Sequence, residues 1–140
     1  MTQAAILYDP DCRFCRVLLA VLLRWDTSGR LRPVALGTDE ADSLLHGMPE
    51  DIRMASWHLV EPNAGRSAAT VHSAGAAFPP VFALLPRGRR LAALGARFPR
   101  ASERGYRWAA DHRSLLSRAI PAAAGRWADG VISGSRPDGR

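Results

Sequence analysis

Two cysteines stand three positions apart near the start of the chain, in the stretch YDPDCRFCR at residues 8–16, and they are the only cysteines in the sequence. Cysteine reacts and binds metals through its thiolate, so such a pair can form an exchangeable disulfide, supply two metal ligands, or have no chemical role. A tetrahedral metal site would need further ligands from the histidines, which are His46, His58, His72 and His112. Since these do not pair at the short spacing typical of metal sites, the sequence favours a redox pair.

The residues around the pair predict that it lies where a strand meets a helix. Residues 3–8 are mostly apolar and end in Asp-Pro-Asp, which predicts a buried strand followed by a turn. From residue 12 to about residue 25, apolar side chains recur at steps of three and four without a helix breaker, which predicts a helix. Asp11 is predicted to cap this helix, because its carboxylate can accept hydrogen bonds from the first backbone N–H groups.

The predicted helix gives the two sulfurs different roles. Cys12 lies at the helix N-terminus, where unpaired N–H groups and the helix dipole stabilise a thiolate, and Arg13 and Arg16 add positive charge. Cys15 follows one turn deeper on the same face, within reach of a disulfide. We therefore expect an exposed Cys12 to attack a substrate disulfide and Cys15 to resolve the mixed disulfide.

Three neighbours of the pair have two interpretations each. Asp9 either relays protons to Cys15 or is a turn residue that bonds its own backbone. Asp11 either caps the helix or opposes the positive charge around the thiol. Phe14, between the cysteines, either covers them or offers an apolar contact to a substrate.

The rest of the chain alternates strands and helices. Residues 31–36 predict a second strand, and residues 54–60 and 67–71 predict an antiparallel hairpin on either side of the turn sequence EPNAGR. Helices are predicted at residues 38–46, at residues 73–85 with an interruption at Pro79-Pro80, at residues 91–98 up to Pro99, and at residues 102–118. This order predicts an α/β fold with a mixed sheet, whose first two strands pair in parallel, as in thioredoxin-like proteins.

Length and composition predict one folded domain at residues 1–120 and an extension at residues 121–140. The extension is expected to be partly disordered, because residues 134–140 have almost nothing to bury. The longest apolar run, residues 17–23, falls well short of the roughly 20 residues of a transmembrane helix. The first residues lack the pattern of an export signal, so we expect a cytoplasmic protein. In that reducing compartment a lone cysteine pair is more typical of catalysis or metal binding than of a permanent crosslink.

The net charge is +6, and every basic side chain is an arginine. Such a bias could serve nucleic acid or an anionic partner. However, the arginines are scattered, with RGRR at residues 87–90 as the only tight cluster, and no aromatic residues interleave with it to stack on bases. A GC-rich coding composition also accounts for abundant Arg, Ala, Gly and Pro. We therefore expect no nucleic-acid partner.

Two motifs resemble a known family. The pattern Y-D-x-D-C-x-x-C, carried here by Asp11, Cys12 and Cys15, resembles the signature of the DCC family of thiol-disulfide oxidoreductases. The sequence GYRWA at residues 105–109 is similar to the family's tyrosine-arginine-tryptophan segment in the last helix. Together with the predicted hairpin, the resemblance covers roughly residues 4–118.

The resemblance implies a thioredoxin-like (glutaredoxin-like) βαβ unit, followed by a hairpin, a helix and extra C-terminal helices. It implies exchange between a dithiol and a disulfide without an obligatory cofactor or metal, acting on a disulfide-containing protein or a small thiol and supplied by an electron donor that the sequence does not name. Tyr106, Arg107 and Trp108 would either line the site or pack structurally. The sequence departs from thioredoxins at residues 53–56, which lack their substrate-binding proline. The alternative function is a thioredoxin-like binding module without catalysis, whose basic residues meet an acidic or membrane-associated partner.

Overall fold

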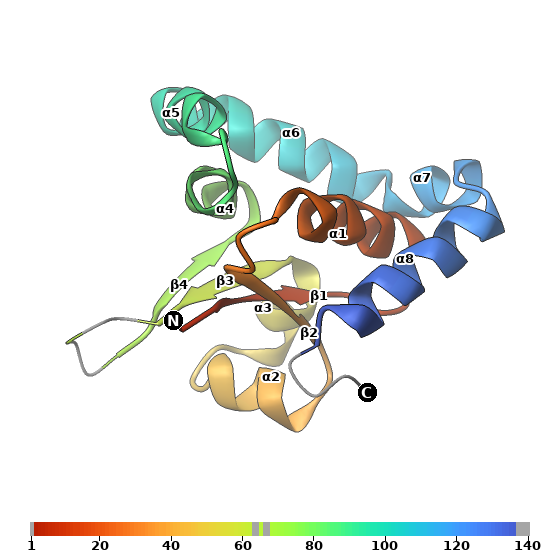
Figure 1. The fold of residues 1–140 in the computed structure, drawn as a ribbon, viewed down its shortest axis with the longest axis horizontal. Coiled ribbons are helices and arrows are strands. Elements are labelled where there is room, and N and C mark those ends of the chain that lie inside the picture. The colour runs from red at the N-terminus through yellow and green to blue at the C-terminus, as the bar shows by residue number, and fades with distance from the viewer. Residues whose placement is uncertain (1, 63–64, 66–67, 137–140) are drawn as a thin grey trace.

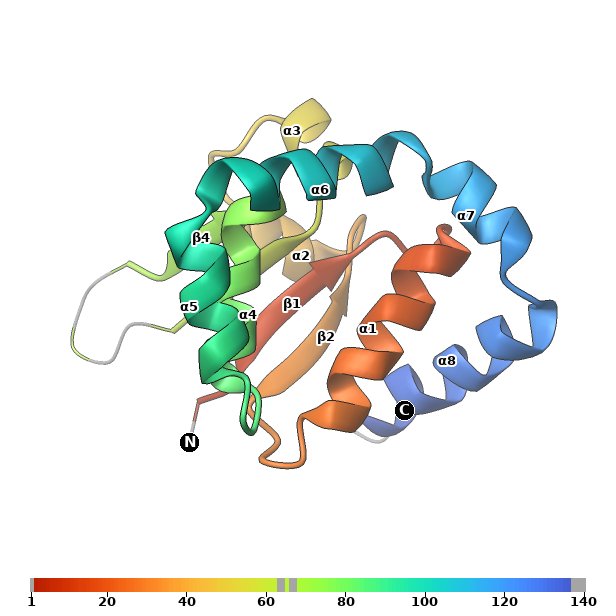
Figure 2. The ribbon, with the colours of Figure 1, turned by 90° about the horizontal axis from the view of Figure 1, so that it is seen from above.

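The chain folds as a mixed four-stranded sheet with helices on both faces (Figures 1 and 2). The structure is a computed structural model that describes residues 2–62, 65 and 68–136. The helices are α1 (Arg13–Trp25), α2 (Asp39–Leu44), α3 (Glu50–Ala55), α4 (Phe78–Leu84), α5 (Arg89–Arg97), α6 (Pro99–Asp111), α7 (Arg113–Ala119) and α8 (Ala122–Gly134), with a short 3₁₀ helix, η1 (Ala74–Ala77), before α4. The α/β, thioredoxin-like fold class is confirmed.

The sheet has the strand order β2-β1-β3-β4. The strands are β1 (Ala4–Tyr8), β2 (Leu31–Ala35), β3 (His58–Glu61) and β4 (Thr70–Ser73). β1 pairs in parallel with β2, with Ala4 opposite Leu31. It pairs antiparallel with β3 on its other side, and β3 pairs antiparallel with β4. The predicted parallel pair and hairpin are therefore confirmed, and β1 is held by hydrogen bonds along both edges.

The strand β1 is also buried on both faces. Alternate side chains of a strand point to opposite sides, so Ile6 and Leu7 enter different layers of the core, and both are 0% exposed. Ile6 packs in a cluster with Leu19 of α1 and Val81 of α4, whereas Leu7 packs with Leu45, which directly follows α2. Burial on both faces explains the continuous apolar run of β1, and it fixes the point where the chain leaves the sheet for α1.

The hairpin is shorter than predicted, because a helix precedes it. Residues 54–60 were expected to be one strand, but α3 includes Met54 and β3 begins only at His58. Glu50 and Asp51 place negative charge in the first turn of α3, directly after Pro49, which favours a helix start. The second strand is Thr70–Ser73 rather than residues 67–71, of which Ser67 lies outside the described residues.

Three prolines lie in the first turns of helices, where the chain was expected to interrupt or restart a helix at Pro79-Pro80 and to end one at Pro99. Pro79 and Pro80 lie in the first turn of α4, and Pro99 is the first residue of α6. A proline lacks the N–H group, but N–H groups in the first turn have no partner within the helix, so no hydrogen bond is lost.

The predicted helix over residues 102–118 is two helices, α6 and α7, which meet at His112. The ring Nδ1 of His112 lies 2.7 Å from the carbonyl oxygen of Trp108, and the backbone N–H of His112 donates to the same oxygen. A side chain that bonds the backbone in this way competes with helical continuation. The break turns α7 out of line with α6, as Figure 2 shows.

A glycine lets α6 approach the core closely. The N–H of Gly75 in η1 donates to Oε2 of Glu103 in α6 at 3.1 Å. A Cβ atom at Gly75 would lie 2.6 Å from the Cα of Glu103, so a side chain there would push the two elements apart. This contact is part of what holds α6 above the sheet.

Within the extension at residues 121–140, which was expected to be only partly disordered, α8 packs against α1 (Figure 2). Gly125 and Ala128 are buried, and Ile132 joins the same cluster as Ile6. Small residues allow two helices to pack closely, so this composition contributes to the core. Residues 137–140 lie outside the described residues.

We predict that Ile132→Ala lowers the free energy of unfolding by about 2–4 kcal/mol, because it leaves a cavity between α8 and the sheet. Ile132 is only 3% exposed. Its exposed neighbour Ser133 provides the control, because Ser133→Ala should leave stability nearly unchanged. Urea unfolding followed by circular dichroism measures both variants. Equal unfolding free energies of Ile132→Ala and Ser133→Ala would mean that the side chains of α8 do not contribute to the core.

A fully buried histidine connects the start of β3 to α3. The ring Nε2 of His58 lies 3.0 Å from the carbonyl oxygen of Arg53, and Nδ1 lies 2.7 Å from the hydroxyl of Ser73. Because a carbonyl only accepts, Nε2 carries the hydrogen and Nδ1 accepts from Ser73. Burial lowers the pKa of His58, and the bond to Arg53 partly opposes this effect.

The lowered pKa of His58 predicts a loss of stability in acid. Below the ordinary histidine pKa of 6.5 the unfolded chain takes up a proton that the folded chain resists, so the stabilisation is present above that pH and declines below it. We expect the wild type to lose more unfolding free energy between pH 7 and pH 5 than His58→Gln, although the variant is less stable at pH 7. Identical slopes for the two proteins would contradict this assignment.

Candidate active site

Cys12 and Cys15 form a disulfide at the N-terminus of α1, with their Cα atoms 5.2 Å apart. The N-cap of α1 is Cys12 itself, in an extended conformation, and its sulfur accepts the backbone N–H of Cys15 at 3.2 Å. The prediction that Asp11 caps the helix is therefore wrong. Because β1 ends at Tyr8, a short turn delivers the first sulfur to the helix N-terminus, as the sequence predicted.

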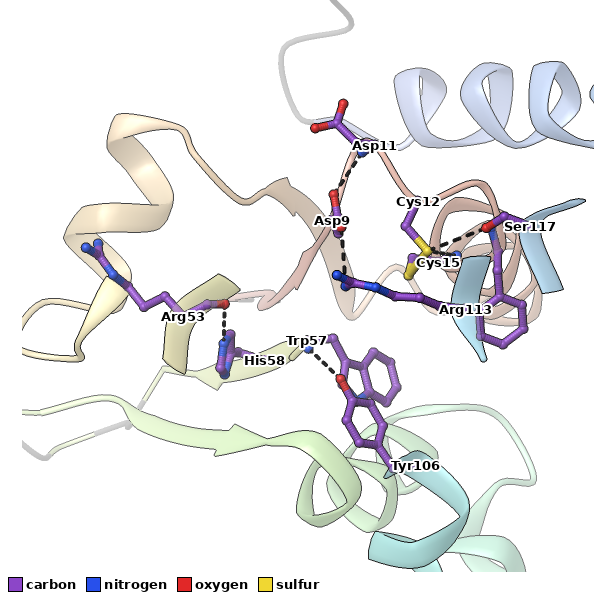
Figure 3. Close-up of polar contacts among 11 residues, drawn as sticks. Asp9, Asp11, Cys12, Cys15, Arg53, Trp57, His58, Tyr106, Arg113 and Ser117 are labelled. Carbon is purple, nitrogen blue, oxygen red and sulfur yellow. Dashed lines mark hydrogen bonds and ion pairs between the residues drawn. A yellow bond between two sulfur atoms is a disulfide. The ribbon is translucent and has the colours of Figure 1, made fainter. Parts of the chain in front are cut away.

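The two acidic residues of this turn bond to each other (Figure 3). Oδ1 of Asp9 accepts the backbone N–H of Asp11 at 2.9 Å, which is the bond of an Asx turn. Oδ2 of Asp9 lies 3.5 Å from Nη1 of Arg113 in α7. Asp11 is exposed. Asp9 thus stabilises the turn and connects it to α7, whereas a proton relay from Asp9 to Cys15 stays a prediction.

The helix α7 covers Cys12. Cys12 is only 7% exposed, in contrast to the exposed sulfur expected from sequence. Oγ of Ser117 in α7 lies 3.9 Å from Sγ of Cys12 and accepts the backbone N–H of Phe14 at 3.1 Å. Since the oxygen of Ser117 accepts from Phe14, its own hydrogen is free to point at the sulfur. Figure 3 shows Ser117 directed at the disulfide.

Both arginines near the pair also hold neighbouring segments. Nη1 of Arg13 donates to the carbonyl oxygen of Ile120 at 2.9 Å, where a cation near the C-terminus of α7 is favourable. Nη1 of Arg16 donates to the carbonyl oxygen of Pro10 at 3.2 Å, and its Nε lies 3.4 Å from Asp129 of α8. These side chains therefore attach α7 and α8 to the start of α1, and their electrostatic effect on the sulfurs stays a prediction.

A cavity of about 210 Å³ lies beside the disulfide, between α1, α6 and the segment that precedes β3. Cys15 lines this cavity, whereas Cys12 does not. The apolar part of its wall includes Phe14, Leu18, Trp57, Phe78, Tyr106 and Ala109. Asp9 and Arg113 are its charged lining residues. The cavity therefore lies against the second cysteine of the pair, and Phe14 belongs to its wall.

Of Tyr106, Arg107 and Trp108, which were expected either to line the site or to pack structurally, Tyr106 lines the cavity. Its hydroxyl oxygen accepts the backbone N–H of Trp57 at 3.1 Å, and the two rings are parallel with centroids 6.5 Å apart. Burial raises the pKa of Tyr106 above its ordinary value, so the hydroxyl keeps its proton at neutral pH. Tyr106 fixes the position of the segment before β3 opposite Cys15.

Arg107 and Trp108 lie on the other side of α6, away from the cavity. Nε of Arg107 pairs with Glu103 at 3.1 Å, one turn earlier in the helix. Trp108 is 58% exposed and stacks on the ring of His112, with centroids 4.7 Å apart. Consecutive helical residues point about 100° apart, which explains why one motif supplies the cavity with a single side chain.

Sequence reasoning did not find Trp57, Arg113 or Ser117 as site residues. Trp57 precedes β3, which runs antiparallel to β1, so it had to lie near the end of β1 and the cysteines; that topological signal was available. Ser117 and Arg113 come to the site from α7, about a hundred positions along the chain, and nothing in the local pattern around them indicates this contact.

Within residues 2–62, 65 and 68–136, no group of three or more His, Cys, Asp and Glu side chains is placed to hold a metal ion. No described helix is long and apolar enough to cross a membrane.

The comparison with family models gives one match. The model described as DCC1-like thiol-disulfide oxidoreductase matches residues 6–119, which include both cysteines, α6 and α7. No curated protein and no solved structure matches the chain.

We predict that Ser117→Ala shifts the dithiol/disulfide equilibrium towards the disulfide by about tenfold, or about 30 mV, because a thiolate at Cys12 loses a hydrogen-bond donor. Titration in glutathione redox buffers measures the shift. Ser117→Thr keeps the hydroxyl and should stay near the wild type, and Ser114→Ala, on the exposed side of α7, is the matched control. A wild-type potential for Ser117→Ala would show that the hydroxyl does not act on the sulfur.

Proposed function

Because the chain belongs to the DCC1-like thiol-disulfide oxidoreductase family, we propose that it exchanges or reduces disulfides through the couple formed by Cys12 and Cys15. The observation that carries the proposal is the disulfide at the N-terminus of α1, with Cys15 in the wall of a cavity. A pair at this position can ionise readily, and it can close again after each exchange.

The reaction passes two electrons between the protein and its substrate. In the reductive direction, one thiolate of the protein attacks a substrate disulfide and forms a mixed disulfide, and the second thiol displaces the substrate as its own thiol. The helix N-terminus and the N–H of Cys15 support Cys12 as the more stable thiolate. The first attack by Cys12, with resolution by Cys15, remains a prediction of the sequence.

The substrate would be a protein disulfide or a small thiol compound, and a separate electron donor would restore the dithiol. The sulfurs carry the electrons themselves, so this reaction needs no added cofactor. A cytoplasmic location is part of the proposal, since a reducing compartment keeps such a pair exchangeable. The direction of the exchange reaction in that compartment depends on the reduction potential of the cysteine pair.

One observation favours the alternative of a binding module. Leu91, Leu94 and Phe98 of the α5 region are 43%, 55% and 51% exposed, and Arg89 and Arg90 lie beside them. A basic and apolar helix surface suits an acidic or membrane-associated partner. Binding that depends on these arginines and is indifferent to loss of both cysteines would support this alternative.

We expect the wild type to reduce insulin or a small aromatic disulfide in the presence of a thiol donor, and Cys12→Ser and Cys15→Ser to fall to background, because neither variant can close the protein disulfide. Turnover is followed by insulin precipitation or by release of the aromatic thiol. Circular dichroism establishes that the variants are folded. Equal turnover by wild type and both variants would remove the proposed function.

A further inference from the structure

We propose that the outer surface of α5 and α6 docks the protein on an anionic lipid bilayer. This α5–α6 surface consists of the exposed side chains of residues 87–108. The inference goes beyond the proposed function, because it concerns a part of the chain that no step of the exchange reaction uses. It also commits the basic helix surface to one partner, which is the lipid itself.

The α5–α6 surface carries the whole net charge of the chain. Residues 87–107 contain seven arginines and a single acidic residue, Glu103, which gives a net charge of +6, and the complete chain also has +6. The charges of all other residues therefore cancel. Glu103 is directed towards η1, because its Oε2 accepts the backbone N–H of Gly75 at 3.1 Å. The outer side of the two helices is therefore strongly positive.

Three apolar side chains lie among these arginines and face solvent. Leu91, Leu94 and Phe98 follow one another at steps of three and four, so they share one side of the helix, and each is about half exposed. Arg90 and Arg97 lie one turn before and one turn after Leu94. The guanidinium of Arg97 lies 5.7 Å from the ring centroid of Phe98. Cations and apolar groups are therefore neighbours, and a partner must accommodate both.

The two helices form an outer layer of the molecule, above α4 and α1 in Figure 1. Arg100, Arg104 and Trp108 recur at steps of four along the exposed side of α6 and continue the basic surface from α5. In Figure 2, α5 lies at one end of α6, whereas α7 and the start of α1, with the disulfide, lie at the other end. Docking through α5 therefore leaves the disulfide free to exchange.

An anionic bilayer matches both the charge and the apolar side chains. Lipid phosphates pair with guanidinium groups at the level of the headgroups, while leucine and phenylalanine side chains of a helix that lies flat enter the acyl boundary. A protein partner would need a concave groove for the helix, whereas a fluid lipid surface adapts to it. Every residue of α5 except Ala92 and Gly95 is exposed, which suits such a surface. Nucleic acid would pair with the arginines but would leave the leucines in water.

The first experiment measures how the full chain sediments with lipid vesicles. Vesicles of phosphatidylcholine are compared with vesicles that also contain about 30% phosphatidylglycerol, and we expect at least about tenfold tighter binding to the anionic vesicles. Arg90→Gln combined with Arg97→Gln should weaken that binding about 25-fold, because each arginine near an anionic surface contributes about fivefold. Arg24→Gln combined with Arg126→Gln removes the same charge from exposed positions of α1 and α8 and should bind nearly as the wild type does.

The second experiment tests whether apolar side chains enter the bilayer. Leu94→Gln keeps every charge, and we expect it to weaken binding to the anionic vesicles about fivefold, because the leucine no longer leaves water. Its binding should also fall more steeply with salt than that of the wild type, since mainly screened charges remain. Ile52→Gln makes a comparable change at a residue of α3 that is 50% exposed, and it should bind as the wild type does.

Three results would overturn the proposal. One is equal binding of the wild type to both kinds of vesicle, and another is an equal loss in the double variant of α5 and in the double variant of Arg24 and Arg126. The third is a single-stranded oligonucleotide that binds as tightly as the anionic vesicles, through Arg90 and Arg97 but without Leu94, which would assign the surface to nucleic acid.

Docking and the proposed function are tested separately. The α5 variants should reduce insulin in solution as the wild type does, because α5 lies away from the disulfide. A variant without both cysteines should still bind the anionic vesicles. Failure of vesicle binding therefore overturns docking alone, whereas failure of insulin reduction by the wild type overturns the proposed function alone.

Discussion

The position of the disulfide depends on the burial of one strand. β1 is paired along both edges and packed on both faces, so its last residue, Tyr8, cannot shift without disrupting the core. Only a short turn separates Tyr8 from Cys12, and the bond from Asp9 to the N–H of Asp11 fixes that turn. The sulfur of Cys12 therefore arrives at the first turn of α1 because the sheet holds the chain in place, and the helix dipole then acts on it.

The C-terminal helices connect stability to chemistry at the same point. Arg13 bonds the carbonyl oxygen that follows α7, Ser117 of α7 bonds the first turn of α1, and Arg16 pairs with Asp129 of α8. Each contact involves a residue in the first turn of α1, and Ser117 also covers the sulfur of Cys12. A domain that ended before α7 would expose Cys12 and leave the N–H of Phe14 without this partner.

The sequence predicted the junction of β1 and α1 well, because its signals are local: an apolar run, turn residues and then helical spacing. It did not predict the burial of Cys12, because Ser117 lies 105 positions away and resembles any other serine on a helix. The packing of α8 was not predicted for a related reason: small residues form a close helix contact only where a partner surface exists, and here α1 provides one to Ala128.

The asymmetry between the two sulfurs follows from their positions on one helix. The residue at the N-cap has the free N–H groups of the first turn around it, and α7 reaches the same place because those groups and Arg13 bind it. The residue three positions later lies on the face that α6 leaves open, above the aromatic cavity. The hydrogen-bond donors of the first turn and Ser117 therefore lie at Cys12, whereas the aromatic cavity lies against Cys15.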